Sequence, residues 1–439
     1  MARKHIYDRD LGYTLLRPWA DWGIRFSYLK AEVHGKSNVP EDGAVIICPN
    51  HCNTLMDALV MLRAHKGPTV FGARADIFRK PLFAKLLYFC RLVPIVRQRD
   101  GIRNVLQNKD TQKTIVETIE NGVRFCIFAE GKHRTMHSLM TLGKGAIRIA
   151  LEANEKFGTQ KPVYLVPAGI EYGDYFRYHT SALVVYGDPV NVTEFVKENQ
   201  YDNEAQLIDA LRKELAARIS KLITYIPDNE NYEATWTLTK MLRINGSRKM
   251  YGRSCGSLFK AMTGNREAVA EIESKISEKP EQMRVLLDKV NAFEKSRKDA
   301  KVSIFSFRKK CDVWNVVYRL ITAVLGLPYF IYSAVTSLPL WAIAMKLRSG
   351  MKDPAFGNTA SFGIKLGVGT ILFILYTVLA FCLAPWWLAL TLILLWIPSY
   401  SYFHDYIEGC RITISDIRLI FNKTLKKNFN DIIKDYGTL

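Results

Sequence analysis

The sequence predicts an α/β fold, in which a mixed, partly parallel sheet is flanked by helices and is followed by a helical insert and carboxy-terminal transmembrane helices. Three observations indicate this. Short apolar runs alternate with helical stretches up to about residue 225, charge-rich helical patterns follow, and two long uncharged runs lie near the carboxy terminus. Alternation of strands and helices is typical of a sheet covered by helices. With 439 residues, the chain exceeds one ordinary domain, so we expect at least two units.

The chain divides into five predicted segments. In order they are an amphipathic amino-terminal helix region (1–30), an α/β domain (31–225), a helical connector (226–311), membrane segments (312–404) and a basic tail (405–439). In the first segment, apolar residues such as Trp19 and Trp22 recur at helix-like spacing among basic residues. A basic amphipathic helix with tryptophans can lie in a membrane interface or pack on the sheet domain, and the pattern allows both.

The elements of the α/β domain are predicted from short apolar runs and from helical periodicity. The expected strands cover residues 45–48, 69–71, 125–128, 164–166 and 182–186. The expected helices between them include residues 103–120 and 143–156. In the connector, Arg266–Ser277 and Pro280–Ala300 are charge-rich and helical, and Pro280 suits the first turn of a helix.

Two uncharged runs predict the membrane segments. Leu320–Met345 has 26 residues without Asp, Glu, Lys or Arg, and Leu366–Phe403 has 38. About 20 helical residues cross a bilayer core, so the first run fits one span and the second fits two, separated at Pro385. The expected spans are therefore 320–345, 366–384 and 386–403.

The flanking charges predict an orientation. Arg308, Lys309 and Lys310 precede the first run, and the positive-inside rule then places the amino-terminal region in the cytoplasm. We therefore expect a protein of the inner or cytoplasmic membrane whose large domain faces the cytosol. Two alternatives are a buried core hairpin of a soluble protein and, because Gly326 and Pro328 interrupt the first run, a re-entrant hairpin there.

The net charge of +19 comes from 61 Lys and Arg against 42 Asp and Glu. Such a charge indicates an anionic partner, which is nucleic acid, an anionic lipid surface or a phosphorylated substrate. The sequence has no recognisable nucleic-acid-binding motif, so we expect no nucleic acid. Eight cysteines without a Cys-x-x-Cys pair are typical of a reducing, cytosol-facing environment. Cys48 and Cys52 flank His51, but no second cluster follows at zinc spacing, so no metal is expected.

A first chemical motif, PNHCNTLMD (49–57), directly follows the strand expected at 45–48. The polar turn exposes His51 at the edge of the sheet. A neutral histidine can take a proton from a hydroxyl group, and a nearby carboxylate can fix its tautomer and stabilise the imidazolium. Asp57 is the expected carboxylate partner.

Three further motifs follow other strand ends. The second motif consists of FRKP (78–81) and LVPIVRQR (92–99), and its residues Arg97 and Arg99 follow an apolar strand. Guanidinium groups at such a place can bind a phosphate. FAEGKHR (128–134) and LGKG (142–145) contribute Glu130, Gly131, Lys132, Arg134 and Lys144. VPAGI (166–170) contributes Pro167. Ligand sites of α/β sheets lie outside strand ends, so these motifs support one another.

The four motifs resemble those of the glycerolipid acyltransferases, the family of lysophosphatidate and glycerol-3-phosphate acyltransferases, over about residues 28–190. The preceding segment VHGKSNVP (33–40) is similar to the one that the family places before its catalytic histidine. The resemblance implies that His51 is the general base and that Asp57 is its partner. It also implies that Arg97 binds the phosphate of the acyl acceptor, that Glu130 and Gly131 bind the acceptor, and that Pro167 lies on the acyl-donor side. The further expected substrate-binding residues are Arg99, Lys132, Arg134 and Lys144.

The sequence departs from the family pattern at two places. Five residues separate His51 and Asp57, whereas the commonest pattern has four. One extra residue turns a helical side chain by about 100°, so the turn before Leu55 must absorb it. In the third motif, Lys132 and Arg134 lie one and three residues after the glycine instead of two, so either could meet the phosphate.

The predicted function is that of a membrane-bound O-acyltransferase of phospholipid biosynthesis. It would move a fatty acyl group from acyl-CoA or acyl-acyl-carrier protein to the hydroxyl of 1-acyl-sn-glycerol-3-phosphate, making phosphatidate without a covalent acyl-enzyme, a metal or a cofactor. The expected partners are a phosphorylated glycerol or lysophospholipid acceptor, the acyl donor and anionic membrane lipids. The alternatives are glycerol-3-phosphate 1-O-acylation, acylation of another lysophospholipid and, in a different class, a non-catalytic lipid-binding membrane protein.

Overall fold

The computed structural model describes residues 5–65, 67–96, 105–245, 256–309 and 311–439. The chain forms two compact units. The first unit comprises Met1–Arg25, Ala31–Glu171 and Ala182–Ile223. The second unit comprises Phe26–Lys30, Tyr172–Ser181 and Thr224–Leu439.

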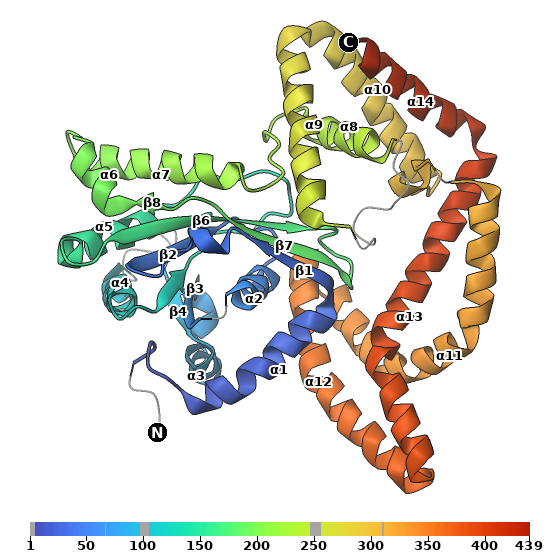
Figure 1. Cartoon of the computed structure of the whole chain (residues 1–439), viewed down its shortest axis with the longest axis horizontal. Helices are drawn as coiled ribbons and strands as arrows, with labels where there is room; N and C mark the ends of the chain where they lie inside the picture. Colours follow the sequence, from blue (N-terminus) through green and yellow to red (C-terminus); the bar gives the residue numbers. More distant parts are fainter. Residues whose placement is uncertain (1–4, 66, 97–104, 246–255, 310) are drawn as a thin grey trace. The chain divides into compact units, whose positions relative to one another are not determined.

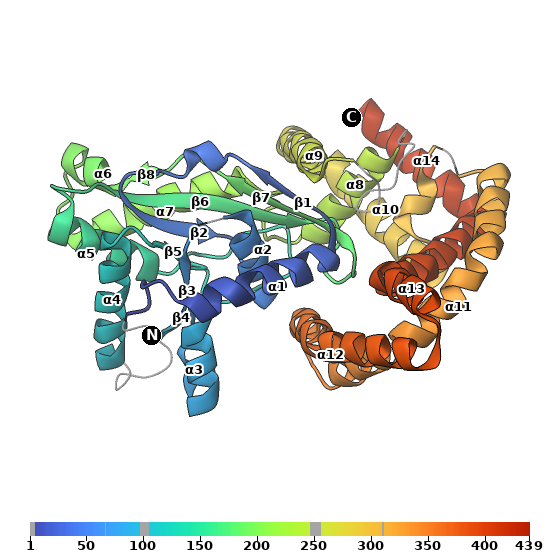
Figure 2. The same cartoon turned by 60° about the horizontal axis from the view of Figure 1, so that its bottom comes forward.

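An eight-stranded sheet has the order β1-β7-β6-β2-β5-β3-β4, and β8 pairs with β6 (Figures 1 and 2). The pairs β2–β5, β2–β6, β3–β4 and β3–β5 are parallel, and β6–β8 is antiparallel. The sheet is therefore mixed and partly parallel, which confirms the predicted fold class. The strands are β1 (Tyr28–His34), β2 (Ala44–Pro49), β3 (Thr69–Arg74), β4 (Leu92–Ile95), β5 (Arg124–Cys126), β6 (Val163–Tyr172), β7 (Thr180–Tyr186) and β8 (Val190–Asn191).

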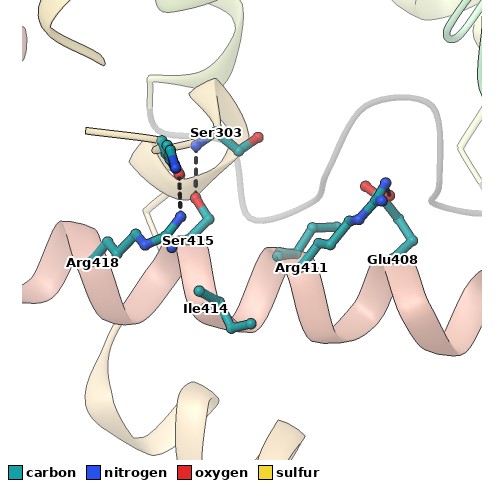
Figure 3. A pocket seen from close by; sticks show the side chains of 8 residues that line it. Ser303, Glu408, Arg411, Ile414, Ser415 and Arg418 are labelled. Carbon is teal, nitrogen blue, oxygen red and sulfur yellow. Dashed lines mark hydrogen bonds and ion pairs between the residues drawn. The ribbon is translucent and has the colours of Figure 1, made fainter. Parts of the chain in front are cut away.

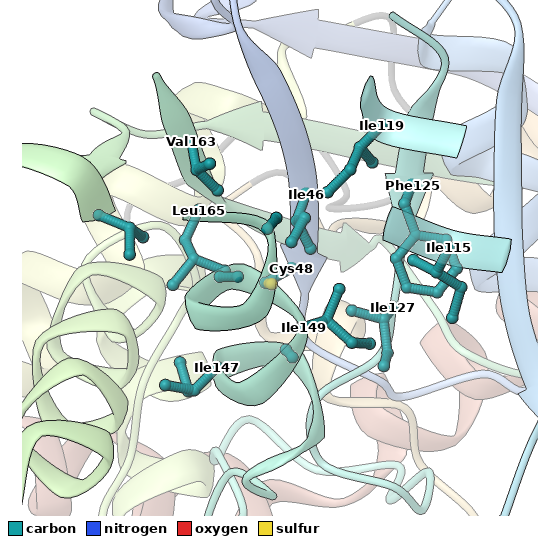
Figure 4. Close-up of a cluster of buried hydrophobic side chains, with 14 of the residues drawn as sticks. Ile46, Cys48, Ile115, Ile119, Phe125, Ile127, Ile147, Ile149, Val163 and Leu165 are labelled. Atoms are coloured by element: carbon teal, nitrogen blue, oxygen red, sulfur yellow. The ribbon is translucent and has the colours of Figure 1, made fainter. Parts of the chain in front are cut away.

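Seven helices accompany this sheet in the described part of the first unit. They are α1 (Leu11–Ser27), α2 (Leu55–Ala64), α3 (Pro81–Phe89), α4 (Val105–Glu120), α5 (Gly145–Phe157), α6 (Val192–Glu198) and α7 (Glu204–Ser220). The strand β2 lies inside the sheet, and all six of its residues are buried. Ile46 and Cys48 point into one core with Ile115 of α4 and Ile147 of α5 (Figure 4). Burial on both faces explains why β2 reads as a continuous apolar run rather than as an alternating one.

The strand β1 was not among the predicted strands. Its residues lie partly in the predicted amino-terminal helix region, 1–30, but the helix α1 ends at Ser27 and the strand begins at Tyr28. On α1, the side chains of Leu11, Leu15 and Trp22 remain between 52% and 75% exposed, and Ile24 is buried. The apolar side of α1 is therefore left largely uncovered.

The second unit contains a compact group of helices with its own apolar core. Its helices are α8 (Tyr232–Ile244), α9 (Leu258–Glu278), α10 (Pro280–Asp299), α11 (Val313–Ser349), α12 (Pro354–Leu383), α13 (Trp386–Phe421) and α14 (Lys423–Thr438). Leu238 of α8, Phe293 of α10 and Phe429 of α14 share this core. Residues 405–439 were predicted as a basic tail, but they complete α13 and form α14. The helix α14 packs through its apolar residues, which charged residues separate in the sequence.

Within the described residues, three helices are long and apolar enough to cross a membrane: α11, α12 and α13. A break at Pro385 separates the last two, as predicted, because α12 ends at Leu383 and α13 begins at Trp386. The re-entrant alternative for the first run is wrong, since α11 continues through Pro328 as one helix of 37 residues. The hydroxyl groups of Tyr402 and Tyr406 on α13 donate to backbone carbonyl groups of α11, so the two helices lie side by side (Figure 1).

A buried ionic group joins the carboxy-terminal end of α13 to the chain before α11. The carboxylate of Asp416 is fully buried and accepts two hydrogen bonds from the guanidinium of Arg308, at 2.5 and 3.0 Å. Ser306 donates to the same carboxylate at 2.7 Å, and Arg319 lies 3.3 Å from it. Such a group has to remain complete, because an unpaired buried charge is strongly destabilising.

We expect Asp416→Ala to lower the free energy of unfolding by about 3–5 kcal/mol, because it leaves the buried Arg308 guanidinium without its carboxylate. Thermal unfolding of the full chain in detergent measures this loss. The matched control is Asp431→Ala, which removes an exposed carboxylate of α14 and should change stability by less than about 0.5 kcal/mol. Equal melting temperatures for the two variants would contradict a stabilising role of the buried group.

Candidate active site

The parallel strands β2, β5 and β6 bring the predicted motifs to one edge of the sheet. Ile47 of β2 lies beside Cys126 of β5, and Cys48 lies beside Pro167 of β6. The segments that leave these strands therefore meet outside their carboxyl ends. His51 follows β2, Glu130 follows β5, and both belong to the first unit.

Asn50 fixes the chain where it leaves β2. Its side-chain oxygen accepts from the backbone N–H of Ile170 at 2.6 Å, and its side-chain nitrogen donates to the carbonyl of Ile170 at 3.1 Å. The backbone N–H of Asn50 also donates to Ala168 at 3.3 Å. Because Asn50 is buried, these bonds satisfy its polar groups and hold the following histidine at a defined place beside β6.

His51 and Asp57 form a hydrogen-bonded pair. Nδ1 of His51 lies 2.7 Å from Oδ2 of Asp57, and the aspartate is fully buried whereas the histidine side chain is 17% exposed. The same aspartate oxygen accepts from the backbone N–H groups of Cys52 at 2.8 Å and Asn53 at 2.7 Å. One carboxylate therefore holds both the imidazole and the turn that carries it.

The turn absorbs the extra residue between the histidine and the aspartate. Thr54 has φ of 48° and ψ of −128°, an uncommon conformation for a residue other than glycine. The helix α2 begins at the next residue, so Asp57 lies in its first turn. From there its carboxylate reaches back to the backbone N–H groups before the helix. The wider spacing is thus compatible with a His51–Asp57 contact.

This geometry assigns the proton on the imidazole. A carboxylate only accepts hydrogen bonds, so Nδ1 of His51 carries the proton and donates it to Asp57. Nε2 is then the unprotonated nitrogen and can accept a proton from a hydroxyl group. The imidazole also stacks on Phe128, with ring centroids 4.2 Å apart and planes at 23°. Stacking and the aspartate together restrict the orientation of the ring.

Glu130 binds backbone rather than pointing to solvent. One oxygen of its carboxylate accepts from the backbone N–H of His51 at 2.7 Å, and the other accepts from the N–H of Met140 at 2.9 Å. The side chain is buried, and burial raises the pKa of this carboxyl group, although the two backbone hydrogen bonds oppose the shift. Its position links the histidine turn to the segment after β5.

The segment after Glu130 wraps the histidine turn. The backbone N–H of Arg134 donates to the carbonyl of His51 at 3.0 Å, and the hydroxyl of Thr135 donates to the carbonyl of Cys52 at 3.0 Å. Gly131 has φ of 66°, which favours glycine, and a Cβ atom there would meet nothing within 4 Å. The segment thus begins at a left-handed residue beside open space.

The structure distributes the other predicted site residues differently. Lys132 and Lys144 are exposed, and the half-buried Arg134 donates from its guanidinium to Ser138 at 3.1 Å. Pro167 is buried within β6, so its own contribution is to the sheet beneath the site. Arg97 and Arg99 lie outside the described residues.

Sequence reasoning missed three residues that shape the site: Asn50, His137 and Glu171. Nδ1 of His137 lies 3.5 Å from Oε2 of Glu171, and both side chains are buried. Asn50 directly precedes His51 at the end of an apolar run. An amide side chain at such a place can both donate to and accept from the backbone of a neighbouring strand, and this was the available signal. The His137–Glu171 pair joins segments 34 residues apart, so only the fold reveals it.

The neighbouring cysteines are not suited to nucleophilic chemistry. Cys48 and Cys52 are buried, and burial raises the pKa of the Cys48 thiol to about 12. Burial likewise raises the pKa of Cys52, and the charge of Asp57 adds to the shift. Because the thiolate is the reactive form of cysteine, these shifts disfavour a nucleophilic role for either thiol.

The family model described as Acyltransferase matches residues 30–171. A solved structure, that of the 1-acyl-sn-glycerophosphate (LPA) acyltransferase PlsC from Thermotoga maritima, is 18% identical, covers 48% of this chain and 79% of that chain, and has a TM-score of 0.35. No curated protein matches the chain.

The family match spans the strand β2, the His51–Asp57 turn, Glu130 and β6 as far as Glu171. It therefore includes all the side chains that meet at this edge of the sheet. Residues 30–171 thus match the family model of an acyltransferase domain.

Proposed function

We propose that the protein is a membrane-bound O-acyltransferase that makes phosphatidate. It transfers a fatty acyl group from acyl-CoA or acyl-acyl-carrier protein to the hydroxyl of 1-acyl-sn-glycerol-3-phosphate. The observation that carries the proposal is the 2.7 Å contact between His51 and Asp57, which leaves Nε2 of the imidazole as a proton acceptor. Acyl transfer to a hydroxyl needs such a base, because a neutral alcohol is a weak nucleophile.

In the proposed step, Nε2 of His51 takes the proton of the acceptor hydroxyl while the hydroxyl oxygen attacks the thioester carbonyl. The resulting tetrahedral intermediate collapses, the carbon–sulfur bond breaks, and the imidazolium returns the proton to the thiolate that leaves. Asp57 stabilises the imidazolium through Nδ1 and keeps the ring in one tautomer. General base catalysis of this kind contributes about 10²- to 10⁴-fold to a rate.

The same geometry limits where the negative oxygen of the intermediate can be stabilised. The backbone N–H groups of His51, Cys52 and Asn53 already donate to Glu130 or Asp57. An oxyanion needs preorganised donors that are not already engaged. The donors for this intermediate therefore come from other groups than the three N–H groups of the histidine turn.

The acceptor phosphate is assigned to the basic residues around this edge of the sheet. Lys132 and Lys144 are exposed in the segment between β5 and α5. Arg134 is tied to the histidine turn through its backbone N–H. A phosphate held by such cations places the hydroxyl next to the imidazole, and positioning of this kind supplies much of an enzyme's rate. Arg97 and Arg99 are proposed for the same site from the resemblance alone.

Glu130 is proposed as a positioning residue instead of an acceptor ligand. Both of its oxygens are used by backbone N–H groups, one of them that of His51. A buried carboxylate with this pattern orients the chain that carries the base. The acceptor-binding role implied by the family resemblance would require the carboxylate to leave these donors.

Membrane association is proposed from the apolar surfaces of each unit. Three helices, α11, α12 and α13, have the length and composition of membrane spans. On the first unit, α1 exposes Leu15, Trp19 and Trp22, and α3 exposes Leu82, which supports contact of that unit with the membrane interface. The cytosol-facing orientation and the inner or cytoplasmic membrane stay predictions from the flanking lysines and arginines.

We expect His51→Ala and Asp57→Asn to reduce acceptor-dependent thiol release from acyl-CoA by about 10²- to 10⁴-fold, because each removes part of the general base. The purified full chain in detergent is the material, with lysophosphatidate as the acceptor. His34→Ala is the control, because this half-exposed histidine lies on β1 and should leave the rate unchanged. Unchanged turnover in His51→Ala would overturn the mechanism.

Glu130→Gln should lower kcat by about 10- to 100-fold with little change in the KM of the acceptor, since a charged hydrogen bond is worth about 1.5–3 kcal/mol. The amide keeps the size of the side chain but provides one acceptor oxygen where two N–H groups donate. Glu155→Gln on the exposed side of α5 is the matched control. A raised KM with an unchanged kcat would instead support the acceptor-binding role.

An acceptor panel separates the proposed substrate from its nearest rival. We expect thiol release with lysophosphatidate to exceed that with glycerol-3-phosphate or with a lysophospholipid that has a phosphodiester. Lys132→Gln and Arg134→Gln should raise the KM of the acceptor, and the larger increase identifies the closer cation. Activity with glycerol-3-phosphate but not with lysophosphatidate would make glycerol-3-phosphate 1-O-acylation the function. No release with any acceptor would favour the lipid-binding alternative.

A further inference from the structure

A cavity of about 370 Å³ lies beside α13, beyond the uncharged stretch of that helix. Its volume falls within the range of about 300–1,000 Å³ that is common for small-molecule sites. Two segments of the second unit form it, the chain after α10 and one side of α13 (Figure 3). The lining residues are Lys301, Ser303, Glu408, Arg411, Ile412, Ile414, Ser415 and Arg418.

Three cations line the cavity: Lys301, Arg411 and Arg418. All three are exposed, and among the described residues neither Lys301 nor Arg418 forms an ion pair. The nearest carboxylate, that of Glu408, lies 3.9 Å from Arg411 but only 3.0 Å from Arg177. The cavity therefore has an excess of positive charge.

The second nearby carboxylate cannot neutralise these cations. Asp416 follows the lining residue Ser415 in the sequence, but its side chain is buried and bound by Arg308 and Arg319. The buried ionic group thus removes an acid that would otherwise lie next to the cavity. An anion entering from outside would meet three cations and one partly neutralised carboxylate.

The walls of the cavity are joined to each other. The hydroxyl of Ser415 accepts from the backbone N–H of Ser303 at 2.7 Å, and the guanidinium of Arg418 donates to the carbonyl of Lys301 at 3.2 Å (Figure 3). These bonds fix the chain after α10 against α13 before any ligand binds. Preorganisation reduces the entropy lost on binding.

The position of the cavity along the helices matches a membrane interface. Arg319 of α11 reaches Asp416 of α13, so the beginning of α11 lies at the level of the cavity. Within the first two turns of α11, Trp314 is 81% exposed and Tyr318 is 66% exposed. Exposed tryptophan and tyrosine at the end of an apolar helix are typical of the level of lipid head groups. Ile414, which is 48% exposed, adds an apolar contact within the cavity itself.

We propose that this cavity binds the phosphate group of an anionic glycerophospholipid of the surrounding bilayer. The phosphate lies between Lys301, Arg411 and Arg418, and the glycerol and the first acyl carbons contact Ile414. Basic pockets next to membrane helices are suited to anionic head groups, because each Lys or Arg near the surface adds to the attraction. The proposal rests on the proposed membrane association, but it does not depend on the acyl-transfer reaction.

The test measures binding to the purified full chain in a zwitterionic detergent by isothermal titration calorimetry. The probes are dihexanoylphosphatidylglycerol, dihexanoylphosphatidylcholine and sodium phosphate. The two lipids are used below their critical micelle concentrations. Three double variants are compared with the unaltered protein: Arg411→Gln with Arg418→Gln, Lys423→Gln with Lys427→Gln, and the charge-conserving Arg411→Lys with Arg418→Lys. The second pair removes the same charge from exposed positions of the neighbouring α14.

We expect phosphatidylglycerol to bind the unaltered protein more tightly than phosphatidylcholine, and its Kd to rise about tenfold or more in the cavity variant. The α14 variant should change the Kd less than about twofold. The charge-conserving pair Arg411→Lys and Arg418→Lys should retain most of the binding, and equal melting temperatures of the variants show that the fold is intact.

Three results would overturn the proposal. Equal weakening by the cavity variant and the α14 variant would show that only the net charge matters. Equal effects of the cavity variant on sodium phosphate and on phosphatidylglycerol would show a site for free phosphate without a lipid component. Unchanged lipid binding in the cavity variant would also contradict it, whereas a failure of acyl transfer in the unaltered protein would concern only the proposed function.

Discussion

The carboxylate of Asp57 is the group on which the rest of the active site depends. It is fully buried, and one of its oxygens accepts from the imidazole of His51 and from the backbone N–H groups of Cys52 and Asn53. A buried carboxylate without donors would be strongly unfavourable. The turn therefore folds around the Asp57 side chain, and the hydrogen bond between His51 and Asp57 sets the orientation of the imidazole.

Glu130 extends the same constraint to a second strand. Its carboxylate binds the backbone N–H of His51, so three consecutive N–H groups of the turn end on two buried carboxylates. Asn50 fixes the residue before them to β6. The base is thus held by β2, β5 and β6 together. A site supported by several strands keeps its geometry better than one carried by a single loop.

The sequence was sufficient to predict the contact between His51 and Asp57 and the strand that precedes them, because an apolar run followed by a polar turn has a local signature. His51 and Asp57 were both predicted, but the means of bringing them together was not, since it depends on the left-handed Thr54. The role of Glu130 could not be predicted either, because its partners are 79 residues away along the chain and 10 residues away on the other side. The strand β1 was missed, because its alternating residues continue directly from a helix.

In the second unit, buried ion pairing has a consequence for the surface. Asp416 binds Arg308 and Arg319, and Ser306 and Ser415 join their hydroxyl groups beside it at 2.7 Å. Moving the end of α13 would break a buried charge pair, and the cost of that is several kcal/mol, about 3–5 in known cases. Arg411 and Arg418, which lie on the same helix next to this buried pair, therefore keep a fixed height along the helices. A group of cations at one level of the bundle favours anionic over zwitterionic ligands by charge.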